Sequence, residues 1–182
     1  MKILILNGNP DEKNQRFDKY IQEILHGLSE DRNKAEVIML REKKIIHCTG
    51  CWDCWVKNPG ECSFPDDTRE IRQKAINSDI VVFASPIIAG FISGLMKKVM
   101  DKMIPLVHPY ITLVKGECHH MKRYKKYPMM GLITDNISHD PDDEIITKDI
   151  FNRFALNFKT DLVFSFNILT DPNEVINEID SY

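Results

Sequence analysis

Long hydrophobic runs and an excess of positive charge are both missing from this chain of 182 residues. Its 24 Lys and Arg residues stand against 27 Asp and Glu residues, so we expect no nucleic acid partner, because nucleic acid binding needs a basic surface. No apolar stretch is long enough to span a membrane, and the first residues turn polar too soon for a signal peptide. The sequence therefore predicts a cytoplasmic protein, not bound to a membrane, that acts on a small molecule.

Cysteine is scarce and unevenly distributed. Five cysteines are present, and four of them lie between positions 48 and 62. In a chain expected in a reducing compartment, such clustering is typical of metal or redox chemistry rather than of structural disulfides.

Short apolar runs rich in β-branched residues alternate with segments of helical periodicity, which indicates one α/β domain over residues 1–182. Strands are predicted over residues 2–6, 35–40, 79–84, 129–134 and 162–169, and helices over 17–28, 68–77 and 93–104 and from Pro141 and Pro172. Asp66 and Asp67 offer N-caps to the helix over 68–77, and Asp67 and Glu70 have the spacing of a capping box. The positions expected to face the core in the Pro141 helix are Ile146, Ile150, Phe154 and Phe158. The segment between Pro105 and Met129 is predicted as a long connection.

This alternation favours a five-stranded parallel sheet with strand order 2-1-3-4-5 and helices on both faces. Ligands of such sheets lie beyond the carboxyl ends of strands one, three and four, where the strand order reverses. The loops that begin at Asn7, Ser85 and Asp135 are therefore the candidate binding loops.

The first loop leads into a helix N-terminus, where free backbone N–H groups and the helix dipole attract anions. Gly8 permits a close turn. The predicted phosphate ligands, mostly amide and N–H donors with one guanidinium, are Asn9, Asn14, Gln15, Arg16 and Phe17. An ordinary turn between a strand and a helix also uses Gly and Asn, so that alternative stays open.

The second loop offers backbone N–H groups on an apolar wall, which suits the edge and face of an isoalloxazine ring. The predicted ring contacts are Ser85, Pro86, Ile87, Ile88, Ala89 and Gly90. A hydrophobic turn of the core has the same composition and is the alternative.

The cysteine loop is an insertion at about residues 46–65. Cys48, Cys51 and Cys54 are three residues apart, and an Asn-Pro-Gly turn precedes Cys62. Three thiolates at this spacing can bind three corners of a 4Fe-4S cubane, and the turn can return Cys62 to the fourth iron. Two alternatives stay open: zinc bound by four cysteines, and free cysteines that pack as small apolar residues beside Trp52 and Trp55.

Five motifs follow one another in the sequence: Gly8-Asn9-Pro10, Cys48-Thr49-Gly50-Cys51-Trp52-Asp53-Cys54-Trp55, Pro59-Gly60-Glu61-Cys62, Asp66-Asp67 and Ser85-Pro86-Ile87-Ile88-Ala89-Gly90. Together they resemble the NADPH-dependent FMN reductase family and, within it, the iron-sulfur flavoproteins. The similarity extends from Met1 to about Pro105.

The resemblance implies a flavodoxin-like three-layer fold with FMN in the three loops. It adds Thr134, Asp135 and Asn136 as flavin contacts from the third loop, which continues through residues 137–139; a plain capped turn is the alternative there. It also implies a homodimer or homotetramer that passes electrons from NAD(P)H through FMN to a small-molecule or protein acceptor. No catalytic nucleophile or base is expected, because the flavin carries the chemistry.

Two departures from the family pattern bear on cofactor binding. Asn9 and Asp11 stand where family members usually have a serine and an arginine, which weakens the expected phosphate site unless Arg16 compensates. Ile88 stands where many members have a tyrosine. The alternative functions are a flavodoxin- or ferredoxin-like electron carrier without enzymatic activity and a zinc-stabilised binding domain.

Overall fold

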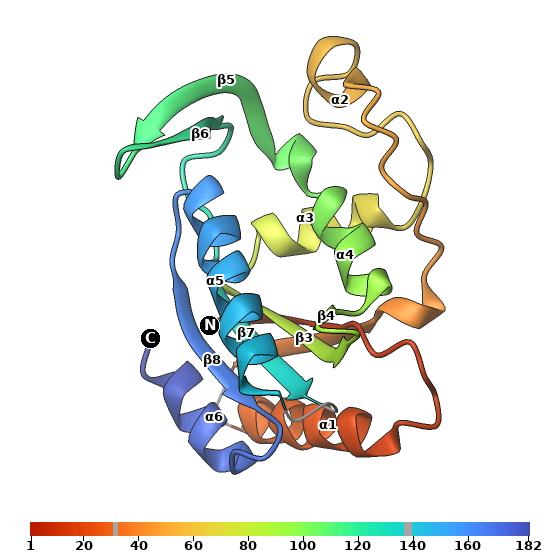
Figure 1. Cartoon of the computed structure of the whole chain (residues 1–182), viewed down its shortest axis with the longest axis vertical. Helices are drawn as coiled ribbons and strands as arrows, with labels where there is room; N and C mark the ends of the chain where they lie inside the picture. The colour runs from red at the N-terminus through yellow and green to blue at the C-terminus, as the bar shows by residue number, and fades with distance from the viewer. Residues whose placement is uncertain (31–32, 137–139) are drawn as a thin grey trace.

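Five parallel strands form the centre of the molecule in a computed structural model, which describes residues 1–30, 33–136 and 140–182. The strands are β1 (Lys2–Asn7), β2 (Lys34–Met39), β3 (Ile80–Ile88), β7 (Met129–Asn136) and β8 (Leu162–Asn167). They pair in the order β2-β1-β3-β7-β8 (Figure 1). This confirms the predicted strand order 2-1-3-4-5.

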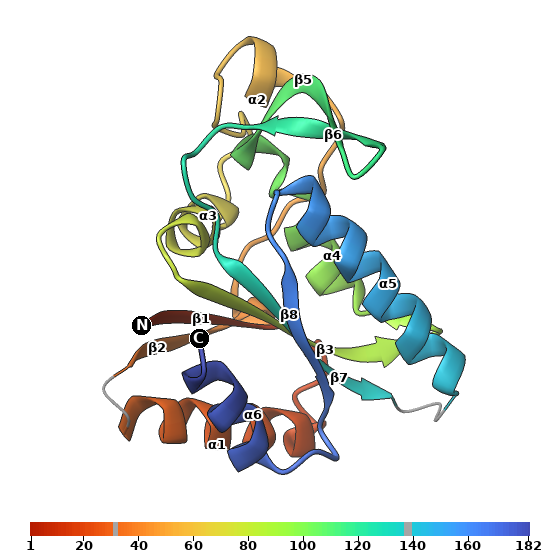
Figure 2. The ribbon, with the colours of Figure 1, turned by 90° about the vertical axis from the view of Figure 1, so that its left-hand side faces the viewer.

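Helices cover both faces of the sheet. One face carries α1 (Gln15–Glu30) and α6 (Pro172–Asp180), and the other carries α3 (Thr68–Ile76), α4 (Gly94–Asp101) and α5 (Pro141–Asn157), as Figures 1 and 2 show. Neighbouring strand residues point to opposite faces, so that Ile3 packs with α1 and α6 whereas Leu4 packs with α3, α4 and α5. The predicted three-layer α/β fold is confirmed.

The core-facing stripe of α5 agrees with the prediction in part. Phe158 is buried and Phe154 packs against the same core, as predicted. Ile146 and Ile150, however, are exposed, at 52% and 37%, and Thr147, Phe151 and Ala155 are buried instead. A repeat of four residues rotates by about 40° per step around a helix of 3.6 residues per turn. Four positions at that spacing therefore cannot all share one face.

The long connection predicted between Pro105 and Met129 contains an antiparallel hairpin, which was not predicted. β5 (Val107–Val114) and β6 (Glu117–Lys122) form a separate two-stranded sheet. Lys115 and Gly116 join them with φ values of 50° and 84°, as two-residue hairpin turns require. The hairpin lies beyond the main sheet beside the short helix α2 (Asp53–Val56) in both ribbon views.

β3 and β7 both extend further than predicted. β3 continues to Ile88 and folds back through Ala89 and Gly90 into β4 (Phe91–Ile92). The residues predicted as the start of the second and third loops are therefore strand residues, paired from Ser85 with Thr134 to Ile87 with Asn136. The rest of the predicted third loop, residues 137–139, lies outside the described residues.

The remaining elements are two short 3-10 helices, η1 (Leu40–Glu42) and η2 (Ile104–Leu106). None of the described helices is long and apolar enough to cross a membrane.

Candidate functional site

A cleft opens where the carboxyl ends of β1, β3 and β7 meet. Its volume is about 440 Å³, within the usual range for small-molecule sites. Its lining is Asn9, Pro10, Asp11, Lys13, Asn14 and Arg16 from the first loop, Pro86 and Ile88 from β3, and Asp135 from β7. The structure thus brings residues from all three predicted loops to the edge at which sheets of this strand order bind ligands.

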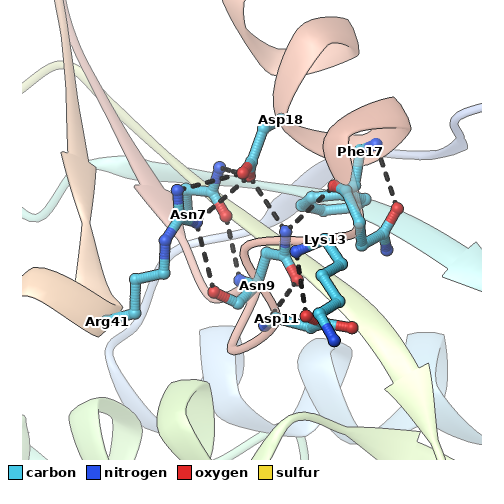
Figure 3. A network of polar contacts seen from close by, with 8 residues as sticks. Asn7, Asn9, Asp11, Lys13, Phe17, Asp18 and Arg41 are labelled. Carbon is cyan, nitrogen blue, oxygen red and sulfur yellow. Dashed lines mark hydrogen bonds and ion pairs between the residues drawn. The ribbon is translucent and has the colours of Figure 1, made fainter.

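The first loop is fastened by Asp18, in the first turn of α1. Its carboxylate accepts hydrogen bonds from the side-chain amides of Asn7 at 2.8 Å and Asn9 at 3.1 Å (Figure 3). Arg41, which follows β2, forms an ion pair of 3.0 Å with the same carboxylate. The sequence analysis missed this pair. An acidic residue in the first helical turn is a usable signal for Asp18, but nothing in the sequence connects it with the distant Arg41.

Several backbone N–H groups of the loop are bound by side chains of the loop itself. Asn9 Oδ1 accepts a bond from the N–H of Asp11 at 3.1 Å, and Asp11 Oδ1 accepts one from the N–H of Lys13 at 2.9 Å. Asn14 Oδ1 accepts one from the N–H of Phe17 at 3.3 Å. The carboxylate of Asp11 therefore binds a backbone donor two residues before α1 begins.

The other predicted cofactor ligands surround the cleft without lining it. Gln15 is exposed at the start of α1, whereas the ring of Phe17 is buried in the core. Ser85 is buried, and its Oγ accepts a hydrogen bond of 2.9 Å from the N–H of Ser93. The remainder, from β3, its turn and β7, are Ile87, Ala89, Gly90, Thr134 and Asn136. Their contact with a cofactor stays a prediction.

A second cavity, also of about 440 Å³, is lined by all four clustered cysteines. Cys48, Cys51, Cys54 and Cys62 share it with aromatic residues that include Trp52, Trp55, Phe64 and Phe158. Trp55 Nε1 donates a hydrogen bond of 3.0 Å to the carbonyl of Val107. This bond fastens the cysteine loop to the β5–β6 hairpin.

The backbone of the cysteine loop adopts left-handed conformations between the cysteines. Gly50 and Trp52 have φ values of 66° and 64°, and α2 begins at Asp53. A left-handed residue beside a right-handed one turns consecutive N–H groups toward the same side, an arrangement found at anion and iron-sulfur sites. Because Trp52 is not a glycine, its left-handed conformation is strained, which is common at functional sites.

Buried charges lie next to the cysteines. The Nζ atom of Lys102 is 3.1 Å from the Sγ atom of Cys62 and 3.1 Å from Oδ2 of Asp66, and both charged side chains are only 1% exposed. Arg72 is also buried, and it donates hydrogen bonds to Thr68 Oγ1 at 2.9 Å and to the carbonyl of Lys102 at 3.1 Å. The sequence placed Asp66 in a motif but gave no sign of the buried Lys102 and Arg72, since charged side chains are mostly exposed.

The expected capping box at the start of α3 is not formed. Asp67 accepts a hydrogen bond from the N–H of Lys44, and Glu70 pairs with Lys43 and Lys74. Asp66 instead binds the N–H and hydroxyl groups of Thr68. Asp66, the other expected N-cap, therefore connects the start of α3 to Lys102 in the wall of the cysteine cavity.

The ionisable groups of the cavity affect one another. Burial raises the pKa of the Cys54 thiol, and the neighbouring Cys62, Cys48 and Cys51 raise it further. Burial alone would raise the pKa of Asp66, but hydrogen bonds from Thr68, the N–H of Ile46 and Lys102 hold it below its usual value. The four thiols are therefore close enough to interact electrostatically.

Within residues 1–30, 33–136 and 140–182, no three or more His, Cys, Asp or Glu side chains are grouped so as to hold a metal ion. The ligands of a cubane bind different iron atoms, so its thiolates stand further apart than those around one ion. The donor chemistry fits such a group: four sulfurs line one cavity, and the cations of Lys102 and Arg72 lie nearby to balance thiolate charge.

The family model described as NADPH-dependent FMN reductase matches residues 1–122. The chain belongs to this family. Membership in the NADPH-dependent FMN reductase family confirms the resemblance found in the motifs and supports FMN as the cofactor.

Curated relatives carry the name of the expected branch. An iron-sulfur flavoprotein of Methanocaldococcus jannaschii is 33% identical over 107 residues, which are 58% of this chain and 53% of the relative. One from Archaeoglobus fulgidus is 30% identical over 102 residues, 56% of this chain and 48% of the relative. The chain thus spans about half the length of the curated relatives it matches.

Solved structures show the same fold at low identity. An FMN-dependent NADH-azoreductase from Bacillus anthracis in complex with FMN is 16% identical with a TM-score of 0.65, covering 100% of this chain and 95% of that one. An NAD(P)H:quinone oxidoreductase from Methanothermobacter marburgensis is 14% identical with a TM-score of 0.64, covering 99% and 93%.

Proposed function

We propose that the protein is an FMN-dependent oxidoreductase that takes electrons from NAD(P)H and passes them through flavin to an acceptor. The observation that carries this proposal is the cleft at the carboxyl edge of the sheet, where residues of β3, β7 and the loop after β1 meet in a member of the NADPH-dependent FMN reductase family. Sheets with this strand order bind FMN where the order reverses.

The residues that line the cleft divide into two groups by chemistry. Lys13 and Arg16 supply positive charge for the phosphate. Asn14 holds the end of the loop, because its Oδ1 accepts a hydrogen bond from the N–H of Phe17. Ile88 is 46% exposed on the β3 side and offers an apolar surface for the ring. The bound flavin supplies the hydride chemistry, and these side chains bind and orient it without acting as acid or base.

We further propose that Cys48, Cys51, Cys54 and Cys62 bind a 4Fe-4S cluster, which supplies one-electron transfer. Two observations support this: all four thiols line one cavity, and the curated relatives are named iron-sulfur flavoproteins. The acceptor is a small molecule or a protein in the cytoplasm.

A homodimer or homotetramer is also part of the proposal. Ile145, Ile146 and Ile150 expose apolar surface on α5, and such surface on a folded protein is often covered by a partner.

Steady-state oxidation of NADPH and NADH tests the enzymatic function. Protein purified without oxygen should consume one or both once a benzoquinone is added as an artificial acceptor. A flavodoxin-like carrier would contain FMN but show no such turnover, which would reject the enzymatic proposal.

Iron content tests the cysteine assignment separately. Cys54→Ser should lose most of the iron, whereas Cys118→Ser, a change at an exposed cysteine outside the cavity, should keep it. Equal iron content in the two variants would show that the cavity does not hold the cluster.

A further inference from the structure

One of the four cysteines has a buried cation as its hydrogen-bond donor. Lys102 follows α4, and its ammonium lies 3.1 Å from the sulfur of Cys62. Cys48 and Cys51, in contrast, are exposed to solvent. A lysine that is 1% exposed is unusual and needs an explanation beyond solubility.

The position of the ammonium is fixed by Asp66. The carboxylate of Asp66 is 3.1 Å from the ammonium and is itself held by the N–H of Ile46 at 3.0 Å and by Thr68. Arg72 fixes the backbone of Lys102, because it donates a hydrogen bond of 3.1 Å to the carbonyl of Lys102. Lys102 is therefore held at Cys62 from both its side chain and its backbone.

Such a donor has a defined effect on a sulfur ligand. A charged N–H group close to a thiolate stabilises its negative charge. Hydrogen bonds and charge near the cysteine sulfurs are among the factors that set the reduction potential of an iron-sulfur cluster. A cation favours the reduced cluster, which carries one more negative charge, so it raises the potential.

We propose that Lys102 is a positioning residue for the cysteine site: its buried ammonium donates a hydrogen bond to the sulfur of Cys62 and so raises the reduction potential of the bound cluster. The inference deepens the proposed function and rests on it for the cluster. Lys102 transfers no electron and no proton; it acts through Cys62 alone.

The first test is the midpoint potential of the cluster in anaerobic holoprotein, measured for Lys102→Met and Lys102→Arg. Lys102→Met should lower it by about 59 mV, a tenfold loss in the one-electron reduction equilibrium, while Lys102→Arg keeps it near wild type. The FMN potential in the same titration should not move. Lys98→Met, in the helix that Lys102 follows and outside the cavity lining, is the matched control. Equal potentials in Lys102→Met and Lys98→Met overturn the proposal.

The second test is the iron content of wild-type protein purified without oxygen, which tells the two failures apart. Protein that takes up no iron overturns the cluster assignment and the role of Lys102 with it. Iron-loaded protein whose cluster potential is the same in Lys102→Met and Lys98→Met overturns only the role of Lys102.

Removal of Lys102 alone leaves Asp66 buried without its cation, which can prevent folding. The double variant Lys102→Met with Asp66→Asn removes both charges, and Asp66→Asn alone is its control. The double variant should show the lower cluster potential relative to that control.

Discussion

Ser93 donates a hydrogen bond of 2.6 Å from its Oγ to the backbone carbonyl of Gly8. The same oxygen accepts a bond of 3.1 Å from the N–H of Met96 and so caps α4. α4 therefore begins against the first loop of the cleft, and Lys102, just after its end, lies in the wall of the cysteine cavity. The 8 residues of α4 span about 12 Å. One short helix connects the two candidate redox sites.

Ser93→Ala should lower the free energy of unfolding by about 2 kcal/mol, since it removes a helix cap and leaves the buried carbonyl of Gly8 without its donor. FMN affinity should fall as well, because the first loop loses its contact with α4. Urea denaturation and FMN titration measure the two effects. Ser29→Ala removes an exposed hydroxyl bonded to the carbonyl of Leu25 and should cost less than about 0.5 kcal/mol. Equal costs would contradict the role given to Ser93.

Arg16→Glu should weaken FMN binding about tenfold or more, because it places a negative charge beside the phosphate. Lys19→Glu makes the same charge change one helical turn away, on an exposed residue outside the cleft lining, and should change the affinity little. Fluorescence titration of FMN compares them. An unchanged affinity in Arg16→Glu would show that the phosphate lies elsewhere.

Asp11→Asn should strengthen FMN binding roughly fivefold. The change removes a negative charge from the cleft but keeps an oxygen that can accept the bond from the N–H of Lys13. The gain should shrink at high salt, because exposed charges are screened. FMN titration at low and high ionic strength measures both. An affinity that falls in Asp11→Asn would mean that the carboxylate supports the bound state.

Asp66→Asn should destabilise the protein at neutral pH by about 3–5 kcal/mol, because the buried ammonium of Lys102 loses its carboxylate. Hydrogen bonds hold the folded-state pKa of Asp66 below its usual value. Its carboxylate therefore contributes stability above an ordinary pKa of about 3.9, and this contribution is lost as pH falls through the lower folded-state value.

Denaturation of wild type and Asp66→Asn at pH values from neutral to acid measures this pH dependence. The difference between their free energies of unfolding should narrow below about pH 4. Asp101→Asn is the control, because Asp101 forms a surface ion pair with Lys97 and both are 46% exposed. Its cost should stay below about 1 kcal/mol. A difference that widens toward acid would contradict the account.

The strand order could be predicted from the sequence because each central strand is a short apolar run that is buried on both faces. The β5–β6 hairpin could not be predicted in this way. The sequence of β6, Glu-Cys-His-His-Met-Lys, is polar, and β6 pairs with β5 outside the main sheet. Gly116 was the usable signal, since a two-residue hairpin turn needs positive φ.

The candidate sites were predictable where residue type alone indicates chemistry. The four cysteines line one cavity and the first loop lines the cleft, as their spacing and position suggested. The charged residues that support them, Asp18 with Arg41 and Asp66 with Lys102, pair across 23 and 36 positions (41 − 18 and 102 − 66). Pairing over such distances depends on the fold, and no local pattern encodes it.

The most direct test of the central claim is the FMN and iron content of protein purified without oxygen, read together with its visible spectrum. The account predicts about one FMN and about four iron atoms per chain, with the flavin bands lying on a broad iron-sulfur absorption. A colourless protein that contains zinc and takes up no FMN would contradict it.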